Sequence, residues 1–140
     1  MSNELKILLV DDDKIMLFLH EMFLKKSGVL FDTVLCYNGQ EALDYLDDYE
    51  SEQTTFLILL DINMPVLNGW EFLEAVQERH YLERLVIVMV SSATEETERS
   101  KALTFKRVIE YQQKPLNVGL CKKLLDAGEL KEFFQDLPFD

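Results

Sequence analysis

Residues 5–13 read LKILLVDDD, a short apolar run that ends directly in three aspartates. This stretch decides the fold, because four further apolar runs of similar length follow it along the chain. They are residues 31–37, 56–60, 85–90 and 108–112. Leu, Val and Ile dominate these runs with little alternation, which is typical of parallel strands that are buried on both faces.

Longer segments with helical spacing separate these predicted strands. They cover residues 14–27, 40–49, 69–80, 94–103 and 117–134. In the first segment we place Met16, Leu19 and Phe23 on the buried face, and Gly28 is a natural stop for the helix. Five strand-then-helix units predict an α/β domain with a doubly wound parallel sheet and right-handed crossovers.

Length and charge narrow the class of protein. We expect one domain over residues 1–140, with a core of about 4–135 and a short C-terminal extension. The net charge of −12 argues against binding nucleic acid or an anionic membrane surface, because both need basic side chains. The longest apolar run, residues 85–90, is too short to cross a bilayer, and no export signal precedes it. We therefore expect a cytoplasmic protein in which Cys36 and Cys121 stay reduced.

Chemically capable side chains follow four of the five predicted strands. They are Asp11, Asp12 and Asp13 after the first strand, Asp61 after the third, Ser91 after the fourth and Lys114 after the fifth. Ligands bind at the carboxyl ends of the strands in this class of fold, so we expect these groups to converge on one crevice. Clustered carboxylates repel one another and need a counter-cation, and an all-oxygen ligand set suits Mg²⁺. The natural interpretation is a metal-assisted phosphoryl site in which Ser91 donates a hydrogen bond and Lys114 neutralises charge.

Each of these side chains also has an ordinary structural explanation. Asp12 or Asp13 would cap the first helix, and Asp61 would open a turn. Tyr111, taken alone, is an ordinary strand aromatic, and Lys114 is an exposed loop lysine. The combination at independent strand ends favours a site, because all of these groups fall where this fold binds ligands.

With these residues in place, the sequence resembles the receiver domain of bacterial two-component response regulators, in its single-domain, chemotaxis-protein-like form. The matching stretches are ILLVDDD at 7–13, LLDINMP at 59–65 with NG at 68–69, VMVSS at 88–92 and YQQKP at 111–115. The resemblance covers about residues 4–135. It implies a flavodoxin-like fold, a five-stranded parallel sheet in the order 2-1-3-4-5 flanked by five helices.

The resemblance also implies a role for each residue of the site. Asp61 is the phosphoacceptor, Ser91 contacts the phosphoryl group and Lys114 pairs with it. Tyr111 is a switch aromatic that turns inward when Ser91 moves toward the phosphoryl group. The implied Mg²⁺ ligands are Asp11, Asp12, Asp61 and the backbone carbonyl of Asn63.

The implied function is that of a stand-alone response regulator. A sensor histidine kinase or a histidine phosphotransfer protein donates the phosphoryl group. Phosphorylation adds up to about two negative charges and changes the binding of a downstream protein, with a phosphorylation-linked dimer as one outcome. The chain is then a phosphoacceptor signalling protein rather than an enzyme, although it promotes its own phosphotransfer and slow autodephosphorylation.

Two other classes of protein remain open at this point. A haloacid-dehalogenase-like phosphatase would use Asp11 as its nucleophile, which fits the acidic loop but leaves Asp61 without a role. A degenerate receiver that is not phosphorylated would serve only as a docking module, although every catalytic position of the family is filled. A flavodoxin-like flavin binder is disfavoured, because three aspartates suit a phosphate poorly.

Three features depart from the family pattern. The residues before the fifth strand are Thr104-Phe105-Lys106-Arg107 where a small Gly-Ala pair is usual, which leaves the seating of the fourth helix open. The loop at 47–55 is longer than typical, and residues 134–140 extend past the usual last helix.

The first helix carries an unusual apolar run at residues 15–19, which cannot all face one core. We expect Phe18 to face solvent, with Leu17 at the flank. Phe18 is then either a scattered surface residue or a contact for the histidine-bearing phosphodonor, whose usual docking surface in this family is the first helix.

Overall fold

The computed structural model describes residues 4–28, 32–92, 95–125 and 130. A five-stranded parallel sheet in the order β2-β1-β3-β4-β5 forms its centre, which confirms the predicted fold class and strand order. The strands are β1 (Glu4–Val10), β2 (Thr33–Cys36), β3 (Thr54–Asp61), β4 (Leu85–Ser91) and β5 (Val108–Gln113). All paired strands run parallel, so their carboxyl ends meet along one edge of the sheet.

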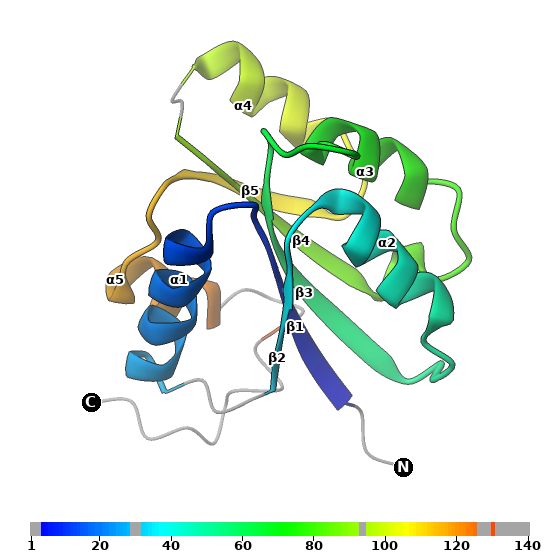
Figure 1. Cartoon of the computed structure of the whole chain (residues 1–140), viewed down its shortest axis with the longest axis horizontal. Helices are drawn as coiled ribbons and strands as arrows, with labels where there is room; N and C mark the ends of the chain where they lie inside the picture. The colour runs from blue at the N-terminus through cyan, green and yellow to red at the C-terminus, as the bar shows by residue number, and fades with distance from the viewer. Residues whose placement is uncertain (1–3, 29–31, 93–94, 126–129, 131–140) are drawn as a thin grey trace.

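Helices cover both faces of the sheet (Figure 1). They are α1 (Lys14–Lys26), α2 (Gly39–Asp48), α3 (Gly69–Val76), α4 (Glu96–Leu103) and α5 (Val118–Leu125), with a short 3₁₀ turn at Leu82–Arg84. Helices α1 and α5 pack on one face, and α2, α3 and α4 lie on the other. The described helices contain no segment long and apolar enough to span a membrane.

The two faces of the sheet bury separate apolar cores, because successive side chains of a strand point in opposite directions. Leu8, Ile58 and Ile87 pack under α2 and α3, whereas Leu9, Leu59 and Val88 pack under α1 and α5. Strand β4 is buried along its whole length, as the near-continuous apolar run predicted. Strand β2 lies at the sheet edge, as the implied strand order requires, and its apolar Leu35 is 38% exposed.

The predicted buried face of α1 is wrong. The helix buries Leu17, His20 and Leu24, whereas Met16, Leu19 and Phe23 are only partly buried. A run of five apolar residues at 15–19 fits several helical phases, so periodicity alone could not choose between them. Leu17 is therefore core and not flank.

Two helix ends differ from the predicted ones, and a third cannot be compared. Helix α3 stops at Val76, four residues before His80, and α4 begins at Glu96. Thr94, where we expected α4 to begin, lies outside the described residues. Helix α5 is described as far as Leu125, and the predicted continuation to residue 134, with Gly128 and Phe133, lies outside the described part of the chain.

The unusual stretch before β5 forms a turn that other side chains support. Arg107 has a φ of 76°, a value usually left to glycine, and its Nε donates to the carbonyl of Leu85 over 2.7 Å. The Gln77 side chain both donates to the Lys106 carbonyl (3.3 Å) and accepts from the Lys106 amide (3.2 Å). Of the side chains of α4 itself, only Ala102 is buried, so the turn at 104–107 helps to seat this short helix.

Candidate functional site

The acidic loop, the third strand and the loop after β5 meet at the carboxyl edge of the sheet. Asp11 and Asp61 are both buried there, at 2% and 5% exposure. The ammonium of Lys114 lies between them, with Nζ 2.7 Å from Asp11 Oδ2 and 3.0 Å from Asp61 Oδ1. The structure therefore brings together three of the residues that the sequence placed in one crevice.

Charge in this crevice is imperfectly balanced. Burial, and then the neighbouring charge of Asp11, raises the pKa of the Asp61 carboxyl above its ordinary value, although Lys114 opposes the rise. Burial works against the charge of Lys114, but hydrogen bonds to Asp11 and Asp61 outweigh it and raise the pKa of the ammonium. Two carboxylates thus share one cation, and Asp61 is the carboxylate that is left less well compensated.

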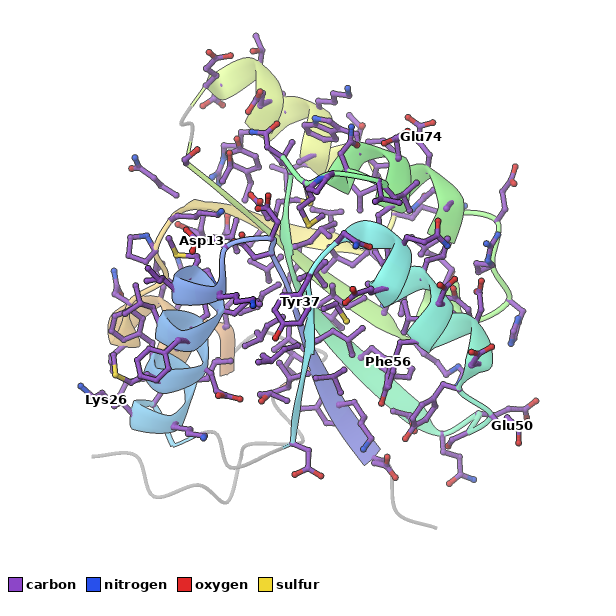
Figure 2. The ribbon with its side chains drawn as sticks, in the orientation of Figure 1. Asp13, Lys26, Tyr37, Glu50, Phe56 and Glu74 are labelled. Atoms are coloured by element: carbon purple, nitrogen blue, oxygen red, sulfur yellow. The ribbon has the colours of Figure 1, made fainter. Side chains whose placement is uncertain are left out.

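The start of α1 orients the acidic loop. The Asp13 side chain caps the helix by accepting from the amides of Ile15 (2.9 Å) and Met16 (3.4 Å). Figure 2 shows Asp13 at the end of α1 that faces the connection from β1. Asp11 Oδ1 accepts from the Asp13 amide (2.9 Å), which fixes its carboxylate in the crevice. Capping therefore explains Asp13, as one of the ordinary explanations predicted, whereas Asp11 and the exposed Asp12 take no part in capping.

Three carboxylates form a set that suits a hard cation. Oxygen atoms of Asp11, Asp12 and Asp61 all lie within 4.8 Å of one another. Mg²⁺ prefers such oxygen ligands and commonly takes few carboxylates while keeping several waters. The donor set fits this ion, and the exposure of Asp12 leaves an open side for water.

Gly69 allows the start of α3 to approach the end of β3 at Asp61. A Cβ at this position would lie 2.5 Å from the Asp61 carbonyl oxygen and 2.9 Å from the Ile62 Cα. The Gly69 amide instead donates to the Ile62 carbonyl over 2.8 Å. The glycine quoted in the sequence motif is thus explained by packing beside Asp61.

Ser91 and Tyr111 lie together next to the crevice. Ser91 is 1% exposed at the end of β4, and Tyr111 on β5 is 4% exposed. The Tyr111 hydroxyl donates to Glu98 Oε2 over 3.0 Å, and the Ser91 hydroxyl interacts with the same phenol. Burial raises the pKa of Tyr111, so its hydroxyl stays protonated. Tyr111 thus lies at the inward end of the movement that the family resemblance implies.

Backbone contacts fix the segment that carries Lys114. The Lys114 amide donates to the Ser91 carbonyl over 2.7 Å, and the peptide bond to Pro115 is cis. Two residues later, the Leu116 amide donates to Nε2 of His20 on α1 over 3.2 Å. Hydrophobic spacing gave no sign of His20, because this polar residue occupies the buried face of α1, or of Glu98, because α4 shows almost no apolar periodicity.

Comparison with known proteins shows the family. A family model of the response regulator receiver domain matches residues 7–126. The transcriptional regulatory protein CpxR of Escherichia coli K12 is 34% identical over 112 residues, which cover 80% of this chain but 44% of CpxR. The two-component response regulator ARR17 of Arabidopsis thaliana is 34% identical over 132 residues, which cover 89% of this chain and 84% of ARR17.

The fold has close counterparts among solved structures. A two-component response regulator from Cytophaga hutchinsonii superposes with a TM-score of 0.82, and the match covers 94% of this chain and 99% of that one. Its sequence identity of 24% makes this a likeness of fold alone. The chain belongs to the response regulator receiver domain family and is a receiver of two-component signal transduction. It spans about half the length of the curated bacterial regulators CpxR and CitT.

Proposed function

We propose that this chain accepts a phosphoryl group on Asp61 from a phosphohistidine donor, a sensor histidine kinase or a histidine phosphotransfer protein. The observation that carries the proposal is the Lys114 ammonium, which lies 2.7 Å from Asp11 and 3.0 Å from Asp61. It supplies positive charge beside a buried carboxylate at the ligand-binding edge of the sheet. Family membership supports the same role, because receiver domains are phosphoacceptor signalling domains.

Transfer requires only positioning and charge from the protein. An Asp61 carboxylate oxygen attacks phosphorus, a P–O bond forms, and the P–N bond to the donor imidazole breaks as the imidazole leaves. Lys114 stabilises the charge on the phosphoryl oxygens, and the Ser91 hydroxyl donates to one of them. The product is an acyl phosphate that water attacks slowly, so the signal decays by itself.

The metal proposal rests on the carboxylate set. Asp11, Asp12 and Asp61 would hold Mg²⁺, together with the backbone carbonyl of Asn63. Bound Mg²⁺ supplies positive charge against the phosphoryl oxygens and the acceptor carboxylate. The protein orients the Asp11 carboxylate for this purpose through its hydrogen bond from the Asp13 amide.

Phosphorylation would be read out through the cluster around Tyr111. A phosphoryl group at Asp61 competes for the Ser91 hydroxyl, which now interacts with the Tyr111 phenol. Tyr111 then keeps its bond to Glu98 on α4 alone. We infer that α4 and β5 change their packing in response and so alter binding to a downstream protein. A cytoplasmic location goes with this proposal, whereas stand-alone action and phosphorylation-linked dimerisation stay predictions.

The exposed face of α1 is the surface we assign to the phosphodonor. Phe18 is 63% exposed and Ile15 is 72% exposed, one turn apart and close behind the acidic loop. A groove lined by Phe18, Glu21, Met22, Lys25 and Lys26 continues along the same face. An apolar helix face beside the acceptor suits the helices that carry a phosphohistidine.

The test is incubation with acetyl phosphate, with and without Mg²⁺, followed by intact-mass measurement. We expect one added phosphoryl group on the wild type, dependent on Mg²⁺, and none on Asp61→Asn. Asp48→Asn, which changes an exposed aspartate of α2, is the matched control and should be phosphorylated normally. Equal phosphorylation of wild type and Asp61→Asn would overturn the proposal.

A further inference from the structure

One histidine is buried between the helix that follows the acidic loop and the segment that carries Lys114. His20 is 3% exposed and shares the inward face of α1 with Leu17 and Leu24. Its Nε2 accepts a hydrogen bond from the Leu116 amide over 3.2 Å, across 96 positions of sequence. Helices α1 and α5 lie side by side at this point (Figure 1).

The imidazole is neutral, as an acceptor must be. Burial, and then the positive charge of Lys114, lowers the pKa of His20 to about 4. At neutral pH the proton therefore sits on Nδ1, and the Nε2 lone pair is available to the Leu116 amide.

The Leu116 amide depends on this acceptor. Leu116 is fully buried, and a buried backbone N–H is costly without a partner. Pro115 has no N–H, so the Leu116 amide is the first backbone donor after Lys114. On the other side, the Lys114 amide donates to the Ser91 carbonyl. The segment is thus fixed to β4 before Pro115 and to α1 after it.

We propose that His20 is a positioning residue for the phosphoryl chemistry, holding the Lys114 segment against α1 so that the ammonium stays between Asp11 and Asp61. The inference rests on the proposed phosphoacceptor function. Asp11 lies between β1 and α1, and its carboxylate accepts from the amide of Asp13, which caps the helix. His20 lies within α1, so the carboxylate and the anchor of its cation are both held by this helix.

An imidazole that only filled the core would be replaceable by any apolar side chain of similar volume. The proposal instead requires an acceptor at Nε2. His20→Leu removes the acceptor and keeps an apolar side chain, whereas His20→Gln places a carboxamide oxygen within reach of the same amide. The pair separates the hydrogen bond from the packing.

Two measurements test the two parts of the proposal, the hydrogen bond to His20 and the position of Lys114. Hydrogen exchange of the Leu116 amide reports the bond itself, and we expect it to accelerate by at least about tenfold in His20→Leu but little in His20→Gln. The rate of phosphorylation by acetyl phosphate with Mg²⁺ reports the position of Lys114. We expect His20→Leu to lower this rate by about tenfold to a hundredfold and His20→Gln to restore most of it.

A double-mutant cycle with Lys114→Ala shows whether His20 acts through the lysine. Once Lys114 is absent, His20→Leu should slow phosphorylation no further. A His20→Leu protein that matches the wild-type rate, or that loses as much activity again in the Lys114→Ala background, would overturn the proposal. His20→Met replaces His20→Leu if the latter does not give a cooperative thermal transition.

The results that would overturn the proposed function differ from those that would overturn the role of His20. A wild-type protein that takes no phosphoryl group on Asp61 would overturn that function, and with it the role of His20 in the reaction, even if Leu116 exchange still accelerates in His20→Leu. A phosphorylated wild type with an indifferent His20→Leu would overturn the role of His20 alone.

Discussion

The Asp61 carboxyl carries a charge that its surroundings disfavour. Burial and the charge of Asp11 raise its pKa, so the folded protein binds a proton there more tightly than the unfolded chain does. The contribution of Asp61 to the free energy of unfolding is most favourable at low pH, where the carboxyl is protonated, and falls as the pH rises through the raised pKa. At neutral pH the ionised carboxyl therefore destabilises the fold. The unfavourable charge of Asp61 thus lowers the stability of the fold, and a bound cation or a phosphoryl group, as we propose, would relieve it.

Replacing this charge by a neutral isostere should stabilise the apo protein. We expect Asp61→Asn to raise the free energy of unfolding at pH 7 by about 1 kcal/mol, the usual size of a stabilising single substitution, measured by urea denaturation without Mg²⁺. Asp48→Asn, at an exposed site, should change it by less than about 0.5 kcal/mol. A clear loss of stability in Asp61→Asn would show that Lys114 outweighs the repulsion.

Asp12 belongs to the proposed cation site and does not cap α1, which is capped by Asp13. We expect Asp12→Ala to weaken Mg²⁺ binding on the order of tenfold, measured by calorimetric titration, because one carboxylate of three is lost. Asp13→Asn is the control, since it removes a neighbouring charge but keeps a good helix cap. Identical Mg²⁺ affinity in Asp12→Ala and wild type would remove Asp12 from the site.

Residue types at strand ends were the most predictable part of the molecule. The apolar run of a buried parallel strand shows where the strand ends, and Asp11 and Asp61 lie at two such ends, so their convergence with Lys114 could be predicted. The roles of Gly69 and His20 could not be predicted from the sequence. The role of Gly69 depends on a backbone so close that an added Cβ would lie 2.5 Å from the Asp61 carbonyl oxygen, and the role of His20 depends on a hydrogen bond across 96 positions. Neither leaves a periodic pattern.

At the scale of elements, the buried face of α1 and the edge position of β2 could not be read from hydrophobic spacing, although the family resemblance implied the strand order. The strands of the sheet centre, β3 and β4, were predictable because burial on both faces makes them uniformly apolar. Strand β2 has a similar composition but lies at the edge, and only the sheet order distinguishes the two cases. In α1 the polar His20 occupies a core position, so hydrophobic spacing pointed to the wrong face.

The loop between β3 and α3 holds a strained residue beside the site. Val66 is 77% exposed and has a φ of 69°, a left-handed conformation that a β-branched side chain rarely adopts. We expect Val66→Asn to raise the free energy of unfolding by about 1 kcal/mol, because Asn tolerates this region better. The comparison is with Val66→Thr, which stays β-branched and should gain nothing. An unchanged denaturation midpoint in Val66→Asn would show that the loop stores no strain.

The outer face of α1 gives a prediction about the phosphodonor. We expect Phe18→Ala to slow transfer from the cognate phosphohistidine protein by about tenfold, as loss of an aromatic contact would, and to leave phosphorylation by acetyl phosphate unchanged. Leu103→Ala is the matched control, because Leu103 is an exposed apolar residue on α4, away from α1. Equal transfer rates for Phe18→Ala and wild type would make Phe18 an ordinary surface residue.

At the scale of the whole molecule, the negative net charge and the acidic site favour the same kind of ligand. The chain has a net charge of −12, and two buried carboxylates in its crevice share one ammonium. Such a protein attracts divalent cations and does not attract polyanions. The parallel sheet gathers acid, hydroxyl and lysine at one edge, and helices cover both of its faces.

The central claim is that Asp61, rather than Asp11, carries the phosphoryl group. Peptide mapping by mass spectrometry after reaction with acetyl phosphate and Mg²⁺ locates the modified residue directly. We expect a single acyl phosphate in the peptide that contains Asp61, and an unmodified peptide around Asp11 and Asp12. Modification of Asp11, as a dehalogenase-like phosphatase would show, or no modification at all, as a degenerate docking module would show, would contradict it.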